Sequence, residues 1–292
     1  MTHAMGGKRR VNSLDALVVF CSPKGATRTA AEMIVKSLTS LSLVTEAVSI
    51  CKDEERASLL ELLHDSKKNI KFLFVGSPVY GFHPLPPVMD LIQRCPSLEG
   101  IHAVPFVTWG GVCSGSALFE MGTALLEKGA FLSGAMKIPA EHSMSWAFSK
   151  PFCGGRPNGE DAARIKNGVQ AIYEKAVTGS TSSLVPLDLS HYTGETLSAM
   201  LEGGFETSKA RFPKIGFDET LCVKCGACAE ACPLACITLS PHPVIGEACV
   251  RCYNCVRVCP EGALTADFSR SEAIILERIE KLREPQETTI FS

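Results

Sequence analysis

The stretch CVKCGACAEACP at residues 222–233 decides how this chain is organised, and it returns as CVRCYNCVRVCP at residues 249–260. In each copy four cysteines follow one another at the same spacing, and a proline comes directly after the last of them. A duplicated ligand pattern of this kind predicts two related sites in one small domain with internal pseudo-twofold symmetry.

The spacing C-x2-C-x2-C-x3-C-P indicates iron–sulfur clusters of the bacterial ferredoxin type. Three thiolates line a tight loop and bind one cubane, whereas the fourth cysteine binds the other cluster. Zinc ribbons also use paired C-x2-C knuckles, but they lack the third and fourth cysteines and the proline. We therefore predict two 4Fe-4S clusters, one held by Cys222, Cys225, Cys228 and Cys259, the other by Cys249, Cys252, Cys255 and Cys232.

The rest of this segment fits the same interpretation. A short strand is expected after each cluster loop, at residues 237–239 and 263–265. Cys236, the ninth cysteine of the segment, aligns with Ala263 of the other copy, which favours a buried small residue over a ligand. Residues 215–268 hold six acidic and three basic side chains, and an acidic surface suits docking to a basic patch on a redox partner protein.

Composition excludes several classes of protein. Nine of the 14 cysteines lie between residues 222 and 259, and the other five stand singly in the first 153 residues, which indicates metal-bound thiolates in a reducing compartment, the cytoplasm. The net charge of −2 suggests neither a nucleic acid nor an anionic membrane as partner. No stretch reaches the roughly 18 apolar residues of a membrane span. Arg9 and Arg10 precede an apolar run that Asp15 interrupts, so a first core strand is favoured over an export signal.

The first 178 residues alternate strand-like and helix-like segments. Strands are expected at 14–21, 44–50, 70–78, 103–110 and 131–139, and helices at 26–41, 53–67, 86–95, 116–129 and 159–177. Five such units in a row predict an α/β fold, a doubly wound five-stranded parallel sheet with helices on both faces. Sheets of this kind bind ligands at the carboxyl ends of their strands.

Three loops at these carboxyl ends carry candidate ligand-binding residues. The loop at 21–29 is short and rich in hydroxyl groups, and it opens directly into a helix whose N-terminus favours a phosphate. The loops at 77–82 and 108–113 each place an aromatic side chain, Tyr80 or Trp109, beside a glycine. Such pairs can hold a flat ring by stacking. The composition is equally compatible with aromatic side chains that only fill space at the end of the sheet and contact no ligand.

Residues 22–27, Ser-Pro-Lys-Gly-Ala-Thr, resemble the flavodoxin phosphate loop Ser/Thr-x-Thr-Gly-x-Thr, with Lys24 in place of a threonine. A lysine there can pair with phosphate or turn to solvent. Together with SPVYG at 77–81, EHS at 141–143 and GGRP at 154–157, this loop makes residues 13–268 similar to the flavodoxin-domain ferredoxins, in which a flavodoxin-like domain precedes a two-cluster ferredoxin.

The resemblance implies FMN binding and electron transfer. It predicts a flavodoxin-like domain at 13–178, a linker at 179–214 with some helix near 195–203, a smaller α+β ferredoxin domain at 215–268, and a C-terminal helix and fraying tail at 269–292. The residues expected to hold FMN are Ser22, Lys24, Gly25, Ala26, Thr27, Pro78, Val79, Tyr80, Gly81, Thr108, Trp109 and Gly110.

The connection at 140–158 is long for a loop and carries three aromatic side chains. It is expected to pack as a satellite core, with a lid over the flavin or a bridge to the cluster domain as the alternative. His142 within it is a candidate proton donor, although a hydrogen-bonded structural histidine is the more common role.

The leading functional hypothesis is a soluble electron carrier or electron-transfer oxidoreductase that works with redox partner proteins through FMN and the two clusters. No acid–base constellation stands out, so no catalytic residue is named. A second hypothesis is an FMN-dependent reductase of a small organic acceptor that receives its electrons from the clusters. An iron–sulfur redox sensor is the third.

Overall fold

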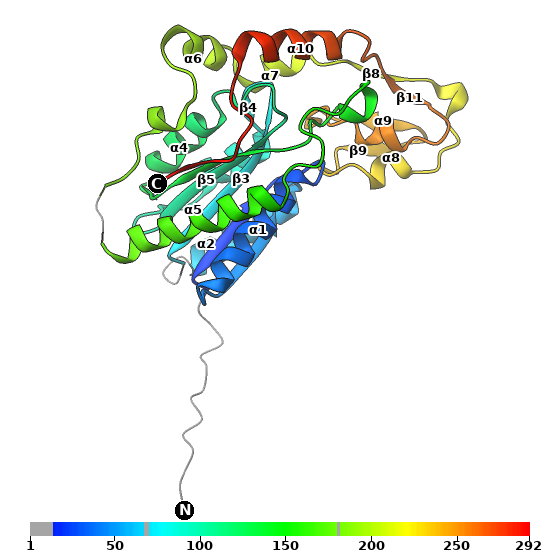
Figure 1. Cartoon of the computed structure of the whole chain (residues 1–292). Coiled ribbons are helices and arrows are strands. Elements are labelled where there is room, and N and C mark those ends of the chain that lie inside the picture. The colour runs from blue at the N-terminus through cyan, green and yellow to red at the C-terminus, as the bar shows by residue number, and fades with distance from the viewer. Residues whose placement is uncertain (1–13, 67–69, 180–181) are drawn as a thin grey trace, which may run out of the picture.

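The computed structural model describes residues 14–66, 70–179 and 182–292 (Figure 1). The arginine pair at residues 9 and 10 lies outside the described residues. A large α/β domain carries a smaller module rich in loops at one side, and α10 (Ser271–Leu282) runs from that module back over the large domain (Figure 1).

The large domain is built on a sheet of eight strands. Its parallel part consists of β1 (Ala16–Phe20), β2 (Thr45–Ser49), β3 (Phe72–Tyr80), β5 (His102–Trp109) and β7 (Ala135–Pro139), in the spatial order β2-β1-β3-β5-β7. This is the strand order of the flavodoxin-like doubly wound fold. The predicted fold class is therefore confirmed.

Helices cover both faces of the sheet, and each face has its own apolar core. On one face α1 (Ala26–Ser40) and α5 (Gly159–Val177) pack on alternate residues of the central strands. On the other face lie α2 (Asp53–Ser66), α3 (Pro86–Arg94) and α4 (Ala117–Glu127). Burial on both faces explains why the central strands are almost continuously apolar in the sequence.

The predicted fifth strand is interrupted. Its first part, β6 (Phe131–Leu132), pairs with the start of β5, and β7 pairs with the end of β5. Gly134 lies in the break, where a Cβ atom would come within 2.4 Å of the side chain of Ile172 on α5. A short strand that was not predicted, β4 (His83–Pro84), folds back antiparallel on the end of β3.

The C-terminal segment is not a frayed tail, so that expectation was wrong. After α10 the chain returns to the sheet, where β12 (Thr289–Phe291) pairs antiparallel with β7 as an edge strand. Between the two elements the carboxylate of Glu284 is buried. It accepts hydrogen bonds from the backbone N–H of Ser114 (2.7 Å), the hydroxyl of Tyr192 (2.8 Å) and the ammonium of Lys137 (2.6 Å).

The segment at 179–214, predicted as a linker, contains more structure than was expected. A 3-10 turn η2 (Pro186–Leu189), α6 (Gly194–Leu201) and α7 (Gly204–Ala210) follow one another. Leu189 belongs to the core beneath α4, and Tyr192 and Leu197 form a second cluster with Cys113. Much of this segment is therefore built onto the α/β domain.

The small module has the predicted twofold pattern of cluster loops and short strands. The strands expected at 237–239 and 263–265 are β9 (Ile237–Leu239) and β11 (Leu264–Ala266). They pair with β10 (Pro243–Ile245) and β8 (Ile215–Phe217), which were not predicted. A short 3-10 turn η3 (Glu219–Leu221) precedes the first cluster loop, and the short helices α8 (Ala227–Glu230) and α9 (Asn254–Val258) lie inside the two loops.

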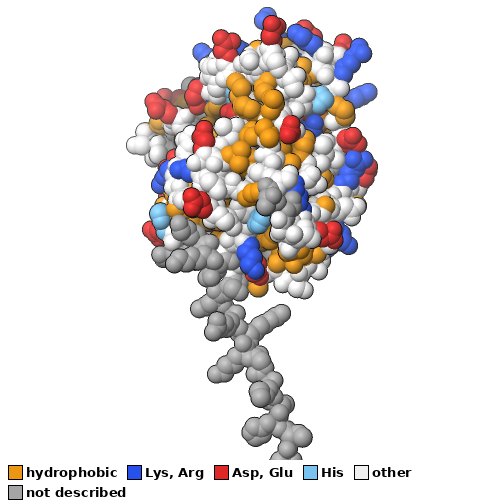
Figure 2. Space-filling model, turned by 90° about the vertical axis from the view of Figure 1, so that its left-hand side faces the viewer, with side chains coloured by type: hydrophobic (Ala, Val, Ile, Leu, Met, Phe, Trp, Pro, Cys, Tyr) orange, Lys and Arg blue, Asp and Glu red, His pale blue; other side chains and the backbone are white. Residues whose placement is uncertain are grey.

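Figure 2 shows the face seen from the left of Figure 1, on which acidic and basic side chains are interspersed around a band of hydrophobic ones. In the described part of the chain, no helix combines the length and the apolar character needed to cross a bilayer.

The buried carboxylate of Glu284 yields a first prediction. Burial by itself would raise the pKa of Glu284, but the Lys137 ammonium and the donated hydrogen bonds hold that pKa below its usual range. A Glu284→Ala variant leaves the charge of Lys137 buried without a partner, so urea unfolding at pH 7 should show a loss of about 3–5 kcal/mol in the free energy of unfolding. Glu280→Ala, at an exposed position of α10, is the control.

The pH dependence of this loss is a second readout. A depressed pKa stabilises the fold above the unfolded value of about 4.3, and this stabilisation is lost as the pH falls through the folded pKa. The difference between the wild type and Glu284→Ala should therefore shrink below about pH 4. A difference of under about 1 kcal/mol at pH 7 would contradict the assigned role of the ion pair.

Candidate functional site

The thiols predicted to bind the first cluster surround one small cavity. Cys222, Cys225 and Cys228 come from the loop around α8, and Cys259 reaches the same cavity from the end of α9. Lys224 and Gly226 in this loop have left-handed backbone conformations (φ of 58° and 80°). Alternating conformations of this kind turn successive N–H groups toward one side of a loop, where they favour an anion.

The thiols predicted for the second cluster surround another cavity in the same way. Cys249, Cys252 and Cys255 line it together with Cys232, and the left-handed positions recur at Arg251 and Tyr253. Four sulfurs spread around a cavity fit a polynuclear cluster better than one zinc ion.

Cys236 was expected to be only a buried small residue, but the structure places its sulfur beside a predicted cluster ligand. It is half-buried in the wall of the second cavity, and its Sγ lies 3.5 Å from the Sγ of Cys232. The alignment of the two halves did not indicate this contact, because Ala263 at the equivalent position of the other half carries no sulfur.

The loop between β1 and α1 has the features of a phosphate site. Gly25 is the N-cap of α1 and has a φ of 95°. Ser22 Oγ accepts the backbone N–H of Arg28 (2.9 Å), and the hydroxyls of Thr27 and Thr108 lie 2.8 Å apart. The first turn of α1 carries no acidic residue that would oppose an anion.

The three predicted ligand loops meet at one edge of the sheet. Ser22, Lys24, Ala26, Thr27, Pro78, Val79, Tyr80, Thr108, Trp109 and Gly110 line a single small cavity. Gly25 lines an adjoining cavity of about 330 Å³, and Gly81 lines a further cavity that also adjoins the first. The structure thus gathers the loops that the sequence placed up to about 90 residues apart, from Ser22 to Gly110.

Two nitrogen atoms at this edge are buried without a hydrogen-bond partner among the described residues, the Nζ of Lys24 and the Nε1 of Trp109. Burial, followed by the nearby Arg257, lowers the pKa of Lys24. Unpaired buried donors are costly, and they fit a ligand that presents oxygen acceptors. Lys24 therefore points into the protein and not to solvent.

The second cluster loop packs directly on this edge of the sheet. Asn254 donates its side-chain N–H to the carbonyl oxygen of Pro23 in the phosphate loop (2.8 Å). Val250 and Cys252 belong to the same apolar core as Tyr80. Arg257 lines the cavity of Lys24 and Gly25. The phosphate loop is thus in contact with the segment that carries a predicted cluster ligand.

The loop at 140–158 packs on both parts of the molecule. Trp146 makes an edge contact with Phe268, at 5.4 Å between ring centroids, and the backbone N–H of Ser149 donates to Glu272 (3.1 Å). His142 packs beside Phe148 and Phe152. The bridge to the cluster module is therefore present, whereas the loop enters none of the apolar cores among the described residues and Trp146 is 39% exposed, so the expected satellite core was not found.

His142 is a neutral residue at the cavity edge. Its Nδ1 accepts the backbone N–H of Met144 (3.3 Å), and burial lowers the pKa of His142 to about 4. A Cβ atom on Gly110 would come within 2.4 Å of its ring, so glycine is required at that strand end. This is the hydrogen-bonded structural role, with the Nε2 proton left as a donor.

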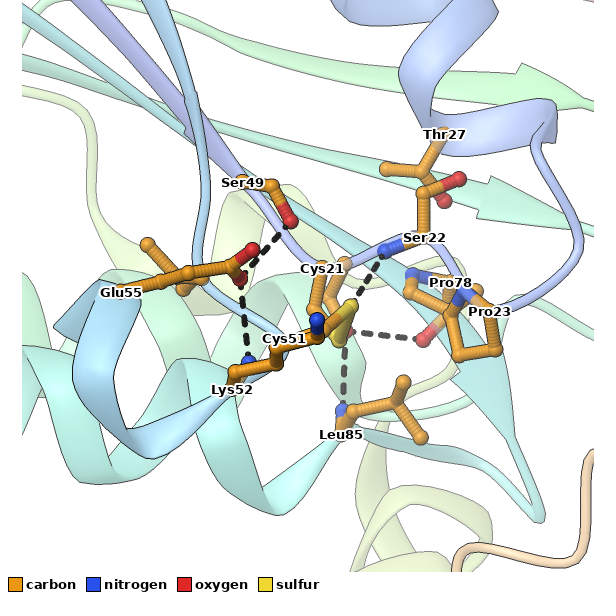
Figure 3. Close-up of a disulfide and its surroundings, with 12 residues drawn as sticks. Cys21, Ser22, Pro23, Thr27, Ser49, Cys51, Lys52, Glu55, Pro78 and Leu85 are labelled. Carbon is orange, nitrogen blue, oxygen red and sulfur yellow. Dashed lines mark hydrogen bonds between the residues drawn. A yellow bond between two sulfur atoms is a disulfide. The ribbon is translucent and has the colours of Figure 1, made fainter. Parts of the chain in front are cut away.

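Two cysteines of the α/β domain, expected to stand singly, form a disulfide. Figure 3 shows Cys21 at the end of β1 joined to Cys51 after β2, beside the phosphate loop. The backbone N–H of Ser22 donates to the Sγ of Cys51 (3.1 Å). Their separation of 30 residues offers no spacing pattern, and only the parallel pairing of β1 with β2 brings them together.

Sequence reasoning missed several residues at this edge. Asn254 and Arg257 were assigned to the cluster module alone, and Arg211, Arg251 and Arg278 were not assigned to a site. A signal was available only for Arg251, Asn254 and Arg257, which lie within five residues of the cluster ligand Cys252. The contact of Asn254 and Arg257 with the phosphate loop depends on how the two domains dock.

Comparison with known proteins supports the C-terminal assignment. Residues 215–238 and 242–265 each match the 4Fe-4S binding domain, so this part of the chain is a ferredoxin-type domain. No curated protein matches the chain.

Solved structures match the α/β domain at low similarity. A rubredoxin:oxygen oxidoreductase from Desulfovibrio gigas is 16% identical with a TM-score of 0.45, over 58% of this chain and 38% of that one. A flavodoxin from the domain Archaea is 21% identical (TM-score 0.39, 55% of this chain and 97% of that one). Flavodoxin 2 from Bacillus cereus is 19% identical with a TM-score of 0.42, over 55% of this chain and 99% of that one. Matches this weak carry no information on function.

The two cysteine sets can be tested by metal content. Cys225→Ala removes a ligand of the first predicted cluster only, so iron in the anaerobically purified protein should fall from about eight to about four atoms per chain. Cys236→Ala, which removes a neighbouring thiol outside both sets, should leave about eight. Equal iron loss in the two variants would overturn the assignment.

Proposed function

We propose that the protein is an electron-transfer flavo-iron–sulfur protein that holds one FMN and two 4Fe-4S clusters. The observation that carries this proposal is the hydrogen bond from Asn254 to Pro23, because it joins the second cluster loop to the phosphate loop. A bound flavin exchanges one or two electrons, and each cluster passes one.

The residues of the phosphate loop fit the phosphate of FMN. Lys24 would supply a buried cation to the phosphate, and the N-terminus of α1 would add its partial positive charge. Thr27 would offer its hydroxyl from the first turn of the same helix. Tyr80 and Trp109 would hold the ring by stacking, with the free N–H of Trp109 as an additional donor.

The surroundings of the two cluster sites suggest an order for electron transfer. The second site adjoins the core of the flavodoxin-like domain through Val250 and Cys252. The first site faces solvent, since Cys225 is exposed and the large apolar side chains Leu221, Val223 and Leu239 beside it are 46–62% exposed. We assign the contact with redox partner proteins to this exposed surface, and the contact with the flavin to the second cluster.

A second candidate function is an FMN-dependent reductase of a small organic molecule. It is favoured by the cavity of about 330 Å³ that adjoins Tyr80 and Gly110, since ligand sites in proteins have volumes of about this size and larger. In this case the cluster module would feed electrons to the flavin, and the cavity would hold the acceptor.

The proposal is tested first by the cofactor content of the protein. Anaerobically purified or reconstituted protein should contain one FMN and about eight irons with matching sulfide per chain. Iron without retained flavin after reconstitution would exclude the flavoprotein part of the proposal. Flavin without iron would exclude the cluster part.

Substitutions in the phosphate loop provide the sharper test. Lys24→Ala removes the buried cation and Thr27→Ala removes the hydroxyl, so each should weaken FMN binding about tenfold or more in a flavin titration of the apoprotein. Lys36→Ala, an exposed position on the same helix, and Thr27→Ser, which keeps the hydroxyl, should bind FMN as the wild type does. Unchanged FMN affinity in Lys24→Ala would place the phosphate elsewhere.

A further inference from the structure

The cavity of about 330 Å³ beside Tyr80 has two walls of different origin. The inner wall belongs to the flavodoxin-like domain and consists of residues 79–82, Gly110 and His142. Tyr80, Gly110 and His142 also line the small cavity at the phosphate loop, so the two spaces adjoin. The outer wall comes from elements outside that domain, namely the end of α7, the loop at 251–253, and α10.

Three arginines reach this cavity from those outer elements, Arg211 after α7, Arg251 in the second cluster loop and Arg278 on α10. Among the described residues that line this cavity, none is an Asp or a Glu. Within the described residues, none of the three arginines forms an ion pair. The cavity is therefore cationic.

The three arginines differ in how free their guanidinium groups are to bind a ligand. Arg251 donates from Nη1 to the carbonyl oxygens of Lys209 (2.8 Å) and Phe212 (2.7 Å), which fixes its side chain in place. Arg278 lies over the ring of Phe82, 5.5 Å from its centroid. Stacking leaves the edge of a guanidinium group free to donate hydrogen bonds. Arg211 and Arg278 thus remain available to a ligand, and Arg251 adds charge.

Apart from the arginines, the lining is largely apolar. Aliphatic and aromatic side chains from both walls contribute, among them Phe82, Val112, Phe212, Ile274 and Ile275. Ile274 is 46% exposed and lies on the same helix as Arg278. A mostly apolar cavity with a few convergent charged groups is the usual composition of a small-molecule site.

We infer that this cavity binds a small organic carboxylate with an apolar body, next to the seat of the flavin. Planar guanidinium groups recognise carboxylates by paired hydrogen bonds, and the apolar walls accommodate the rest of the molecule. Its place beside the flavin rests on the proposed function, whereas binding of the carboxylate itself requires only the cavity.

The experiment is calorimetric titration of the intact, anaerobically purified protein with benzoate and hexanoate, each compared with its neutral amide. We expect saturable binding of at least one carboxylate, and affinity about tenfold or more lower for its amide. Arg211→Gln and Arg278→Gln should each weaken carboxylate binding by a similar factor. Arg270→Gln is the matched control, because Arg270 is exposed just before α10 and does not line the cavity.

Iron and FMN contents of each variant, measured on the same samples, separate the possible results. Carboxylate binding in a protein that retains no FMN supports the cavity and contradicts the proposed flavin. Retained FMN without binding of either carboxylate overturns the carboxylate site and leaves the flavoprotein intact. Loss of FMN in Arg211→Gln or Arg278→Gln also overturns the inference, since the arginines would then belong to the flavin seat. Equal binding of acid and amide overturns it as well.

Discussion

The contact between the second cluster loop and the phosphate loop is the constraint on which the rest of the molecule depends. One amide side chain, Asn254, joins the two loops, and Val250 and Cys252 enter the apolar core of the flavodoxin-like domain. In the proposed function a one-electron centre serves a two-electron centre, which requires that the two be close, and the packing of these loops would provide this without a flexible tether. The Nζ of Lys24 is buried at the same edge of the sheet.

The elements around this contact hold it in place from several sides. The segment at 179–214 packs onto the sheet domain before the chain enters the cluster module, and α10 with β12 brings the chain back afterwards. The buried carboxylate of Glu284 anchors this return to Lys137, whose ammonium lies over the ring of Trp109. A buried ion pair is a poor source of net stability, but breaking it is costly, so it fixes one arrangement of the C-terminal segment.

This architecture also has a functional consequence. Elements outside the flavodoxin-like domain form the outer wall of the cavity beside Tyr80, and this wall carries Arg211, Arg251 and Arg278. These elements thus create a cationic space beside the proposed flavin site. A simple electron carrier does not need such a space, so this cavity is the observation that favours the second candidate function, a reductase.

The sequence by itself determined the cluster module and the order of the α/β elements. Cysteine spacing and the alternation of apolar and helical segments are local properties, and helix α5 was predicted with the bounds it has. Only the tertiary structure decided four other features. They are the strand pairing of 289–291, the Cys21–Cys51 disulfide, the contact of Asn254 with Pro23, and the convergence of three arginines on one cavity. Each joins residues that carry no shared pattern along the chain, because the packing of whole elements, and not local propensity, brings them together.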